Sequence, residues 1–200
     1  VKYNNLLDAK QRVQIAQELM PSIRGKISND QYKVGHFNDS AEILQFVNSK
    51  ELAPLAALGT SCPDHFLRTK IAPLVVAFDP AAADIPQAIS ACAEQLDEQL
   101  QSYRASYTAY YERCKRDNSP AIRDQNAIVY LIPGVGMLTF AKDKATARIA
   151  GEFYINAINV MREAAGVDTY VGLDEQEAFD IEYWVLEEAK LQRMPKAKSM

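Results

Sequence analysis

The chain alternates long amphipathic segments with short apolar runs. Apolar residues recur at steps of three and four from Leu6 to about Ile27, from Ile85 to Cys114 and from about Asp143 to Ala165. This spacing places the apolar side chains on one helical face and predicts three long helices, the first of which Pro21 should bend. Shorter helices are expected at 41–48, at 51–58 and from Asp174 to about Leu191.

Two apolar stretches predict strands between these helices. Ile71–Phe78 is rich in Val, Leu and Ile, and Ala127–Ala141 reads as two strands joined by a Pro133-Gly134 turn. A further short strand is a candidate within Tyr32–Phe37. Because strands alternate with long helices, the pattern predicts a three-layer α/β domain, with a mixed sheet flanked by long helices.

Composition narrows the class of protein. The 200 residues are 48% hydrophobic and carry a net charge of −4, which argues against nucleic acid as a partner because backbone phosphates require a basic face. No apolar run is long enough for a membrane span, and no signal peptide is visible. The three cysteines are odd in number and far apart, which predicts reduced thiols and a cytoplasmic location. The missing initiator Met suggests a piece of a longer polypeptide.

The densest polar segment is Leu58–Lys70, which leads into the first predicted strand. Thr60 and Ser61 would lie at a helix N-terminus, where free backbone amides favour negative charge. Arg68 and Lys70 add two cations, which on a strand would share one face. These four residues form a candidate site for an anionic substrate.

A purely structural interpretation of the same segment is equally consistent with the spacing. Asp64 and Arg68 are four residues apart and could pair on a helix, while Ser61 merely caps it. Both interpretations remain open at the level of the sequence.

Catalytic and metal sites are weaker candidates. Cys62 and His65 could form a nucleophilic pair, although no orienting partner is evident, and Asp64 with His65 is the only plausible proton-handling pair. His36 and His65 are the only histidines, so a metal site would need Asp64 or Cys62 as an additional ligand.

The segment Ile128–Asn159 resembles the end of a class II aldolase/adducin domain. In that family a strand, a Gly-His-Gly turn, a second strand and an Ala-rich helix follow one another, and the turn histidine binds zinc. The corresponding residue here is Val135, which has no lone pair to donate. The resemblance therefore implies an aldolase-like scaffold without its metal.

Leu58–Lys70, Phe179–Trp184 and Glu187–Pro195 together resemble the bifunctional rhamnulose-1-phosphate aldolase/short-chain alcohol dehydrogenase family. The matching region lies between the aldolase and the dehydrogenase modules. The resemblance implies an N-terminal linking helix (1–28), a zinc-less aldolase-like domain (29–194) and a tail (195–200) leading to a dehydrogenase. It places zinc and NAD in the flanking domains, with no cofactor in this chain, and implies a role in rhamnose or other carbohydrate catabolism.

Two functions follow from that resemblance. The chain is expected to act as a non-catalytic scaffold that holds the two catalytic domains and supports a homo-oligomer, with Tyr103–Tyr111 and the last helix as contact surfaces. Alternatively it binds a sugar phosphate at Thr60–Lys70 and contributes to the aldolase or the dehydrogenase site. By itself the fragment is expected to be inactive.

Overall fold

A computed structural model describes residues 6–29, 31–186, 189 and 193. The strands are β1 (Val34–Asn38), β2 (Leu74–Val75), β3 (Val129–Ile132) and β4 (Gly136–Ala141). The helices are α1 (Ala9–Ile27), α2 (Ala41–Val47), α3 (Leu52–Leu58), α4 (Phe66–Thr69), α5 (Ile85–Cys114), α6 (Lys144–Ala164) and α7 (Glu175–Glu182), with a 3-10 turn η1 at Pro63–His65.

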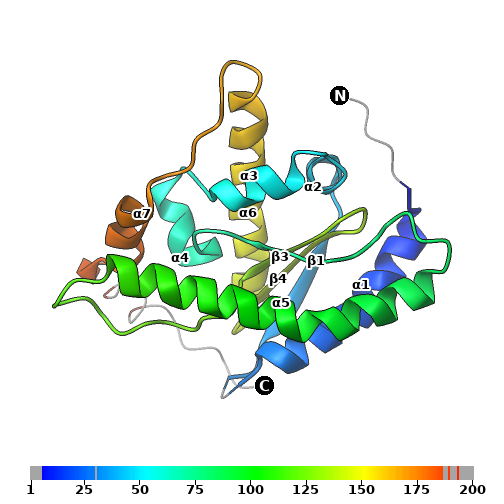
Figure 1. Cartoon of the computed structure of the whole chain (residues 1–200), viewed down its shortest axis with the longest axis horizontal. Coiled ribbons are helices and arrows are strands. Elements are labelled where there is room, and N and C mark those ends of the chain that lie inside the picture. The colour runs from blue at the N-terminus through cyan, green and yellow to red at the C-terminus, as the bar shows by residue number, and fades with distance from the viewer. Residues whose placement is uncertain (1–5, 30, 187–188, 190–192, 194–200) are drawn as a thin grey trace.

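The described elements form three layers, as predicted, with the sheet in the middle (Figure 1). On β3, Tyr130 and Ile132 pack with α1 and α5 on one face, whereas Val129 and Leu131 pack with α2 and α6 on the other. Both faces of the strand are therefore buried, which explains why β3 is a continuous apolar run instead of an alternating one.

The sheet is mixed, in the order β1-β4-β3-β2. β4 pairs antiparallel with both β1 and β3, whereas β2 pairs parallel with β3. Pro133 and Gly134 occupy the central positions of the β3–β4 turn, and Gly134 has a φ of 72°. This is a type II turn, which needs a positive φ at its second central residue and thus favours glycine there.

The long-helix predictions agree closely with the structure at α5, whose bounds are Ile85 and Cys114. α1 starts later than Leu6 because the Asp8 side chain accepts a hydrogen bond from the Gln11 amide and caps the helix. The helix then continues through Pro21.

The first predicted strand is much shorter than its apolar run. β2 comprises only Leu74 and Val75 because Pro73 precedes it and the amide of Phe78 turns back to the carbonyl of Val76. Proline cannot donate a ladder hydrogen bond, and the local turn ends the pairing.

A separate aromatic cluster joins the end of α5 to α7. Its buried rings are Tyr107, Tyr110, Tyr111, Phe179 and Tyr183, and Phe179 stacks on Tyr183 with ring centroids 4.6 Å apart. These tyrosines therefore pack within the chain, although Tyr103, Tyr107 and Tyr110 also line a groove beside α5. Their expected role as a contact surface for a partner stays a prediction.

The predicted N-terminal linking helix and C-terminal tail lie only partly within the described residues. The predicted linking helix corresponds to α1, which contributes Ile15, Leu19 and Ile23 to the same core as the sheet. The predicted tail at 195–200 lies outside the described residues. The sequence predicts that the last helix runs to about Leu191, but α7 ends at Glu182, where Tyr183 caps it, and most of 187–191 lies outside the described residues. Within the described part of the chain, no helix has the length and apolar character that a bilayer span requires.

The loop after α6 gives a sharp test of this packing. A Cβ added at Gly172 would overlap the backbone carbonyl oxygen of Leu58, and a backbone atom cannot move aside as a flexible side chain can. We expect Gly172→Ala to lower the free energy of unfolding by about 2–3 kcal/mol, measured by urea denaturation. Gly25→Ala is the matched control because nothing lies near its added Cβ. Equal stability of the two variants would contradict the close approach of Gly172 to Leu58.

Candidate functional site

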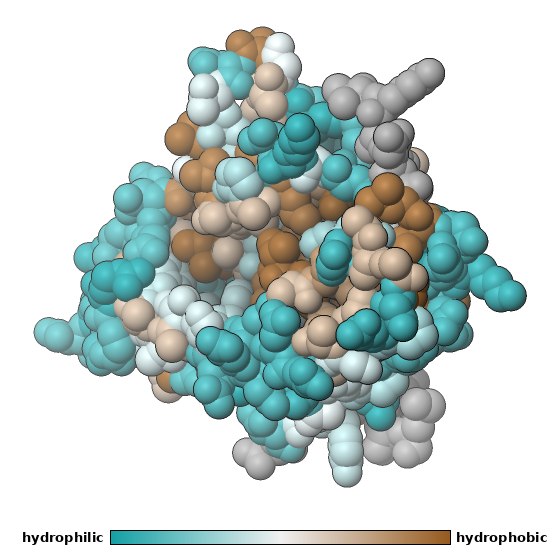
Figure 2. All heavy atoms as spheres, turned by 45° about the vertical axis from the view of Figure 1, so that its right-hand side comes forward, coloured by the Kyte–Doolittle hydropathy of each residue, from teal (hydrophilic) through white to brown (hydrophobic). Residues whose placement is uncertain are grey.

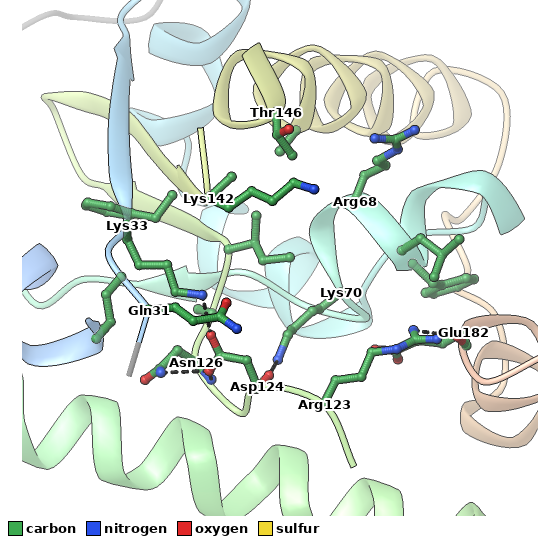
Figure 3. A pocket seen from close by; sticks show the side chains of 18 residues that line it. Gln31, Lys33, Arg68, Lys70, Arg123, Asp124, Asn126, Lys142, Thr146 and Glu182 are labelled. Carbon is green, nitrogen blue, oxygen red and sulfur yellow. Dashed lines mark hydrogen bonds and ion pairs between the residues drawn. The ribbon is translucent and has the colours of Figure 1, made fainter. Parts of the chain in front are cut away.

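A cavity of about 290 Å³ opens between α4, α6, α7 and the segment that precedes β3. Figure 3 shows charged side chains reaching into it from opposite walls. The charged residues that line it are Lys33, Arg68, Lys70, Arg123, Lys142, Asp124 and Glu182. The cavity thus gathers charges that lie far apart in the sequence.

Arg68 and Lys70 are both in the cavity wall, but they reach it from a helix and not from a strand. Arg68 belongs to α4, and Lys70 is the residue that ends it. Lys70 has a φ of 62° and is, within the described ranges, the only residue other than glycine with a positive φ. That conformation costs free energy, which the surrounding contacts must supply.

The Lys70 ammonium is held in a confined environment. Its Nζ lies 3.7 Å from the centroid of the Tyr107 ring and donates a hydrogen bond to the backbone oxygen of Asp124. The residue is only 5% exposed. Burial lowers the pKa of Lys70 to about 8, because desolvation disfavours the charged form more than the charges of Glu182 and Asp124 favour it.

Glu182 brings a buried carboxyl group to the same cavity. It is 1% exposed and accepts hydrogen bonds from the hydroxyls of Tyr107 and Tyr110, at 2.6 and 3.2 Å. Burial raises the pKa of Glu182, and the Tyr107 hydrogen bond and the charges of Lys70 and Arg123 only partly oppose this. Arg123 anchors the segment by donating from Nη1 to the Glu182 backbone oxygen.

Asp124 is the second acid of the cavity, and it is already paired. Its Oδ2 lies 2.6 Å from Lys33 Nζ, and its Oδ1 accepts from the amide of Asn126. Burial acts to raise the pKa of Asp124, but the hydrogen bonds from Lys33 and Asn126 outweigh it and hold the pKa below its usual value. Asp124 therefore neutralises one of the cations that line the cavity.

The electrostatic balance of the cavity is positive. Five cationic side chains line it against two carboxyl groups. Among the described residues Arg68 has no acidic or hydrogen-bonding partner. Its guanidinium lies 5.7 Å from the centroid of the Phe153 ring. The arrangement is thus suited to an anion, with Arg68 as the donor that the protein leaves available.

Thr60 and Ser61 do not line this cavity. Thr60 is buried, and its backbone is used for structure: its amide donates to Ile71 and its carbonyl accepts from Leu173. Cys62, not Ser61, is the residue that precedes the helical turn η1. The two hydroxyl residues therefore lie apart from the two cations with which the sequence grouped them.

Asp64 and His65 also lie outside the cavity. Asp64 is exposed, and no ion pair joins it to Arg68 in the described part of the chain. His65 is buried against α6, with Nε2 3.3 Å from the Asn156 amide nitrogen and its ring edge-on to Phe153. Burial lowers the pKa of His65, although the charge of Asp64 opposes this. The residue packs as a core side chain.

The turn that binds zinc in the resembled family does not fit a metal here. Val135 is fully buried in the apolar core shared by α1 and α5, so this position offers no ligand atom. The described residues contain no cluster of three His, Cys, Asp or Glu side chains arranged to hold an ion.

Several cavity residues were not identified from the sequence. Arg123 and Asp124 lie in a segment that is predicted only as a loop, Lys33 lies in a short candidate strand, and Glu182 is one of many acids in a charge-sorted helix. None of them belongs to a spaced motif. Lys142 could have been found, because it directly follows the end of a buried strand, where α/β proteins place ligand-binding side chains.

Comparison with known proteins identifies related sequences. The family model described as "Aldolase class II, second domain" matches residues 14–191. The chain is 32% identical over 194 residues to "Uncharacterized oxidoreductase YuxG" of Bacillus subtilis (strain 168), covering 97% of this chain. It spans only 27% of that relative's length. No solved structure matches it.

The buried Glu182 predicts a distinctive pH dependence of stability. Its pKa is raised from the usual 4.5 in the folded state, so the folded chain binds more protons than the unfolded chain above that pH. The contribution of Glu182 to stability is then greatest at acidic pH and falls as the pH rises, by up to about 1.4 kcal/mol per pH unit. Urea denaturation between pH 4.5 and 7.5 should show the wild type losing stability relative to Glu182→Gln as the pH rises.

The exposed Glu163→Gln is the control for this measurement, and it should follow the wild-type curve. Parallel curves for the wild type and Glu182→Gln would show that the buried carboxyl group does not titrate as the structure indicates.

Proposed function

The chain belongs to the family of class II aldolase second domains, and on that premise we propose that it binds a small sugar phosphate in the cavity between α4 and α6. Of the two functions expected from the sequence, this is the one that the site geometry supports best. The excess of cations over carboxyl groups in a confined cavity is the observation that carries the proposal.

The two kinds of wall match the two parts of such a ligand. Arg68 and Lys142 lie near Thr146 on one side (Figure 3), where a phosphate could be held by charge and by a hydroxyl group. Ile27, Phe66 and Phe140 provide apolar surface for a carbon skeleton. At about 290 Å³ the cavity lies at the small end of the range for ligand sites, which favours a short sugar chain.

We place this binding module within a larger enzyme of carbohydrate catabolism. The relative in Bacillus subtilis is named as an oxidoreductase and is much longer than this chain. A class II aldolase domain joined to a short-chain dehydrogenase, of the kind that acts on rhamnulose-1-phosphate, would account for both comparisons. In this proposal zinc and NAD belong to the other domains, and the protein is cytoplasmic.

Removing the Arg68 guanidinium tests the binding proposal. Charge-assisted hydrogen bonds contribute about 1.5–3 kcal/mol each, so Arg68→Ala should raise the Kd for inorganic phosphate or dihydroxyacetone phosphate by at least about 10-fold. Isothermal titration calorimetry at low ionic strength measures this. Arg24→Ala is the matched control, because it removes the same charge from an exposed position on α1. Equal loss of affinity in both variants, or no phosphate binding by the wild type, would refute the proposal.

The expected scaffold function has a separate observation in its favour. Figure 2 shows apolar side chains gathered around a hollow on the face that carries α3 and α5. A groove of about 980 Å³ lies there, and it is lined in part by Leu58, Ile71, Leu74 and Val75. Leu58 is 47% exposed. We propose as the second candidate that this groove is a contact surface between copies of the chain in a homo-oligomer. In this candidate function the module also holds the flanking catalytic domains.

Sedimentation equilibrium tests that second candidate. If the groove is the contact, the mass should rise with protein concentration, and Leu58→Asp should weaken the association by at least about 10-fold, because a buried unpaired carboxylate is costly. Val13→Asp is the control: Val13 is similarly exposed, at 42%, but lies on α1. A wild type that stays monomeric at all concentrations would remove the self-association candidate.

A further inference from the structure

Lys70 brings an amine to the cavity from a strained backbone position. Lys70 ends α4 with a positive φ, a conformation that glycine adopts without steric cost. A side chain at this position is therefore strained, and Lys70 is one of the residues that line the cavity. Figure 3 shows Lys70 extending from the end of the helix toward Asp124, on the wall that faces Arg68 and Lys142.

The surroundings of Nζ favour a neutral amine more than an ordinary ion pair would. Among the described residues no carboxylate forms a salt bridge with Lys70. Its contacts are the face of the Tyr107 ring and the backbone oxygen of Asp124. With a pKa of about 8, roughly a tenth of the side chains are neutral at pH 7, compared with fewer than about one in a thousand for an exposed lysine.

We infer that Lys70 forms an imine with the carbonyl carbon of the sugar phosphate bound in the cavity. A buried lysine with a free lone pair is the usual nucleophile for carbonyl compounds. The inference rests on the proposed function, because the phosphate group held opposite Lys70 is what keeps the carbonyl group within its reach.

The reaction balances without any additional reagent. The Nζ lone pair attacks the carbonyl carbon, and one proton moves from the nitrogen to the former carbonyl oxygen, which gives a carbinolamine. That hydroxyl group accepts a second proton and leaves as water, and the nitrogen lone pair forms a C=N bond, which leaves a protonated imine. Glu182 lines the same cavity, and burial raises its pKa. In this inference its carboxyl group supplies that second proton and becomes a carboxylate, which accepts hydrogen bonds from the hydroxyls of Tyr107 and Tyr110.

The alternative is that Lys70 has only a structural role, in which its ammonium holds the backbone of Asp124 in place. Both roles require a buried lysine, but only the imine requires a neutral amine that reaches a carbonyl carbon. Covalent trapping separates the two, because a purely structural lysine forms no adduct.

The experiment incubates the 200-residue chain with dihydroxyacetone phosphate and sodium cyanoborohydride, which reduces an imine to a stable secondary amine. Peptide mapping by mass spectrometry then locates the adduct. We expect Lys70 to be labelled at least 10-fold more than any other lysine, with a rate that rises with pH through about 8 as more of the amine becomes neutral. Inorganic phosphate should compete with the labelling.

Two variants and a second ligand complete the design. Lys70→Arg keeps the positive charge and should bind dihydroxyacetone phosphate in calorimetry while losing the adduct, whereas Lys10→Arg should leave the adduct on Lys70 unchanged. Dihydroxyacetone without its phosphate should label Lys70 at least 10-fold more slowly.

The outcomes distinguish this inference from the proposed function. Phosphate binding without an adduct, or with an adduct spread evenly over surface lysines, would overturn the imine and leave the binding module intact. No phosphate binding in calorimetry would overturn both. An adduct on Lys70 that forms equally well without the phosphate group would support the amine but contradict the cavity as a phosphate site.

Discussion

The whole arrangement depends on burying the β3–β4 hairpin on both faces. Val129 to Ile132 point alternately into two separate cores, one with α1 and α5 and one with α2 and α6. A strand that is apolar on both sides is stable only when helices cover both sides. The type II turn at Pro133-Gly134 fixes the register of the hairpin, and the positions of the flanking helices follow from it.

The cavity forms where this layered packing stops. α4, the start of α6 and the segment that leads into β3 converge beyond the covered part of the sheet. The charged side chains come from α4 (Arg68), from the segment before β3 (Arg123 and Asp124) and from Lys142, which precedes α6. Charges cannot enter either apolar core without a large desolvation cost, so they gather at this boundary. The two acids at this boundary contact other groups: Asp124 forms an ion pair with Lys33, and Glu182 accepts hydrogen bonds from tyrosine hydroxyls. Because five cations line the cavity against these two acids, its net charge is positive.

Glu182 and Tyr107 link the cavity to the end of the described chain. Tyr107 on α5 contacts Lys70 through its ring and Glu182 through its hydroxyl group, and Glu182 is the last residue of α7. A ligand that changed the charge on Lys70 would therefore act directly on the contact between α5 and α7. Electrostatic interactions are strong in a low-dielectric interior. Tyr107 belongs to the aromatic cluster and contacts two cavity residues, so a change of charge in the cavity alters the packing of that cluster.

The sequence by itself determined the long helices and the β3–β4 hairpin, because local spacing is enough to specify them. The spacing of the apolar residues predicted the bounds of α5, and the Pro133-Gly134 pair predicted the hairpin turn. The fold class followed from the alternation of helices with strands. The sequence also identified Arg68 and Lys70 as candidate anion-binding residues, because two cations in one polar segment can be recognised without knowing the fold. Only the tertiary structure decided which charges meet, since Lys33, Asp124 and Glu182 lie in three distant segments. It also separated Thr60 from the cations, because the backbone of that residue is bonded to Ile71 and Leu173, and no periodicity along a chain encodes such long-range hydrogen bonds.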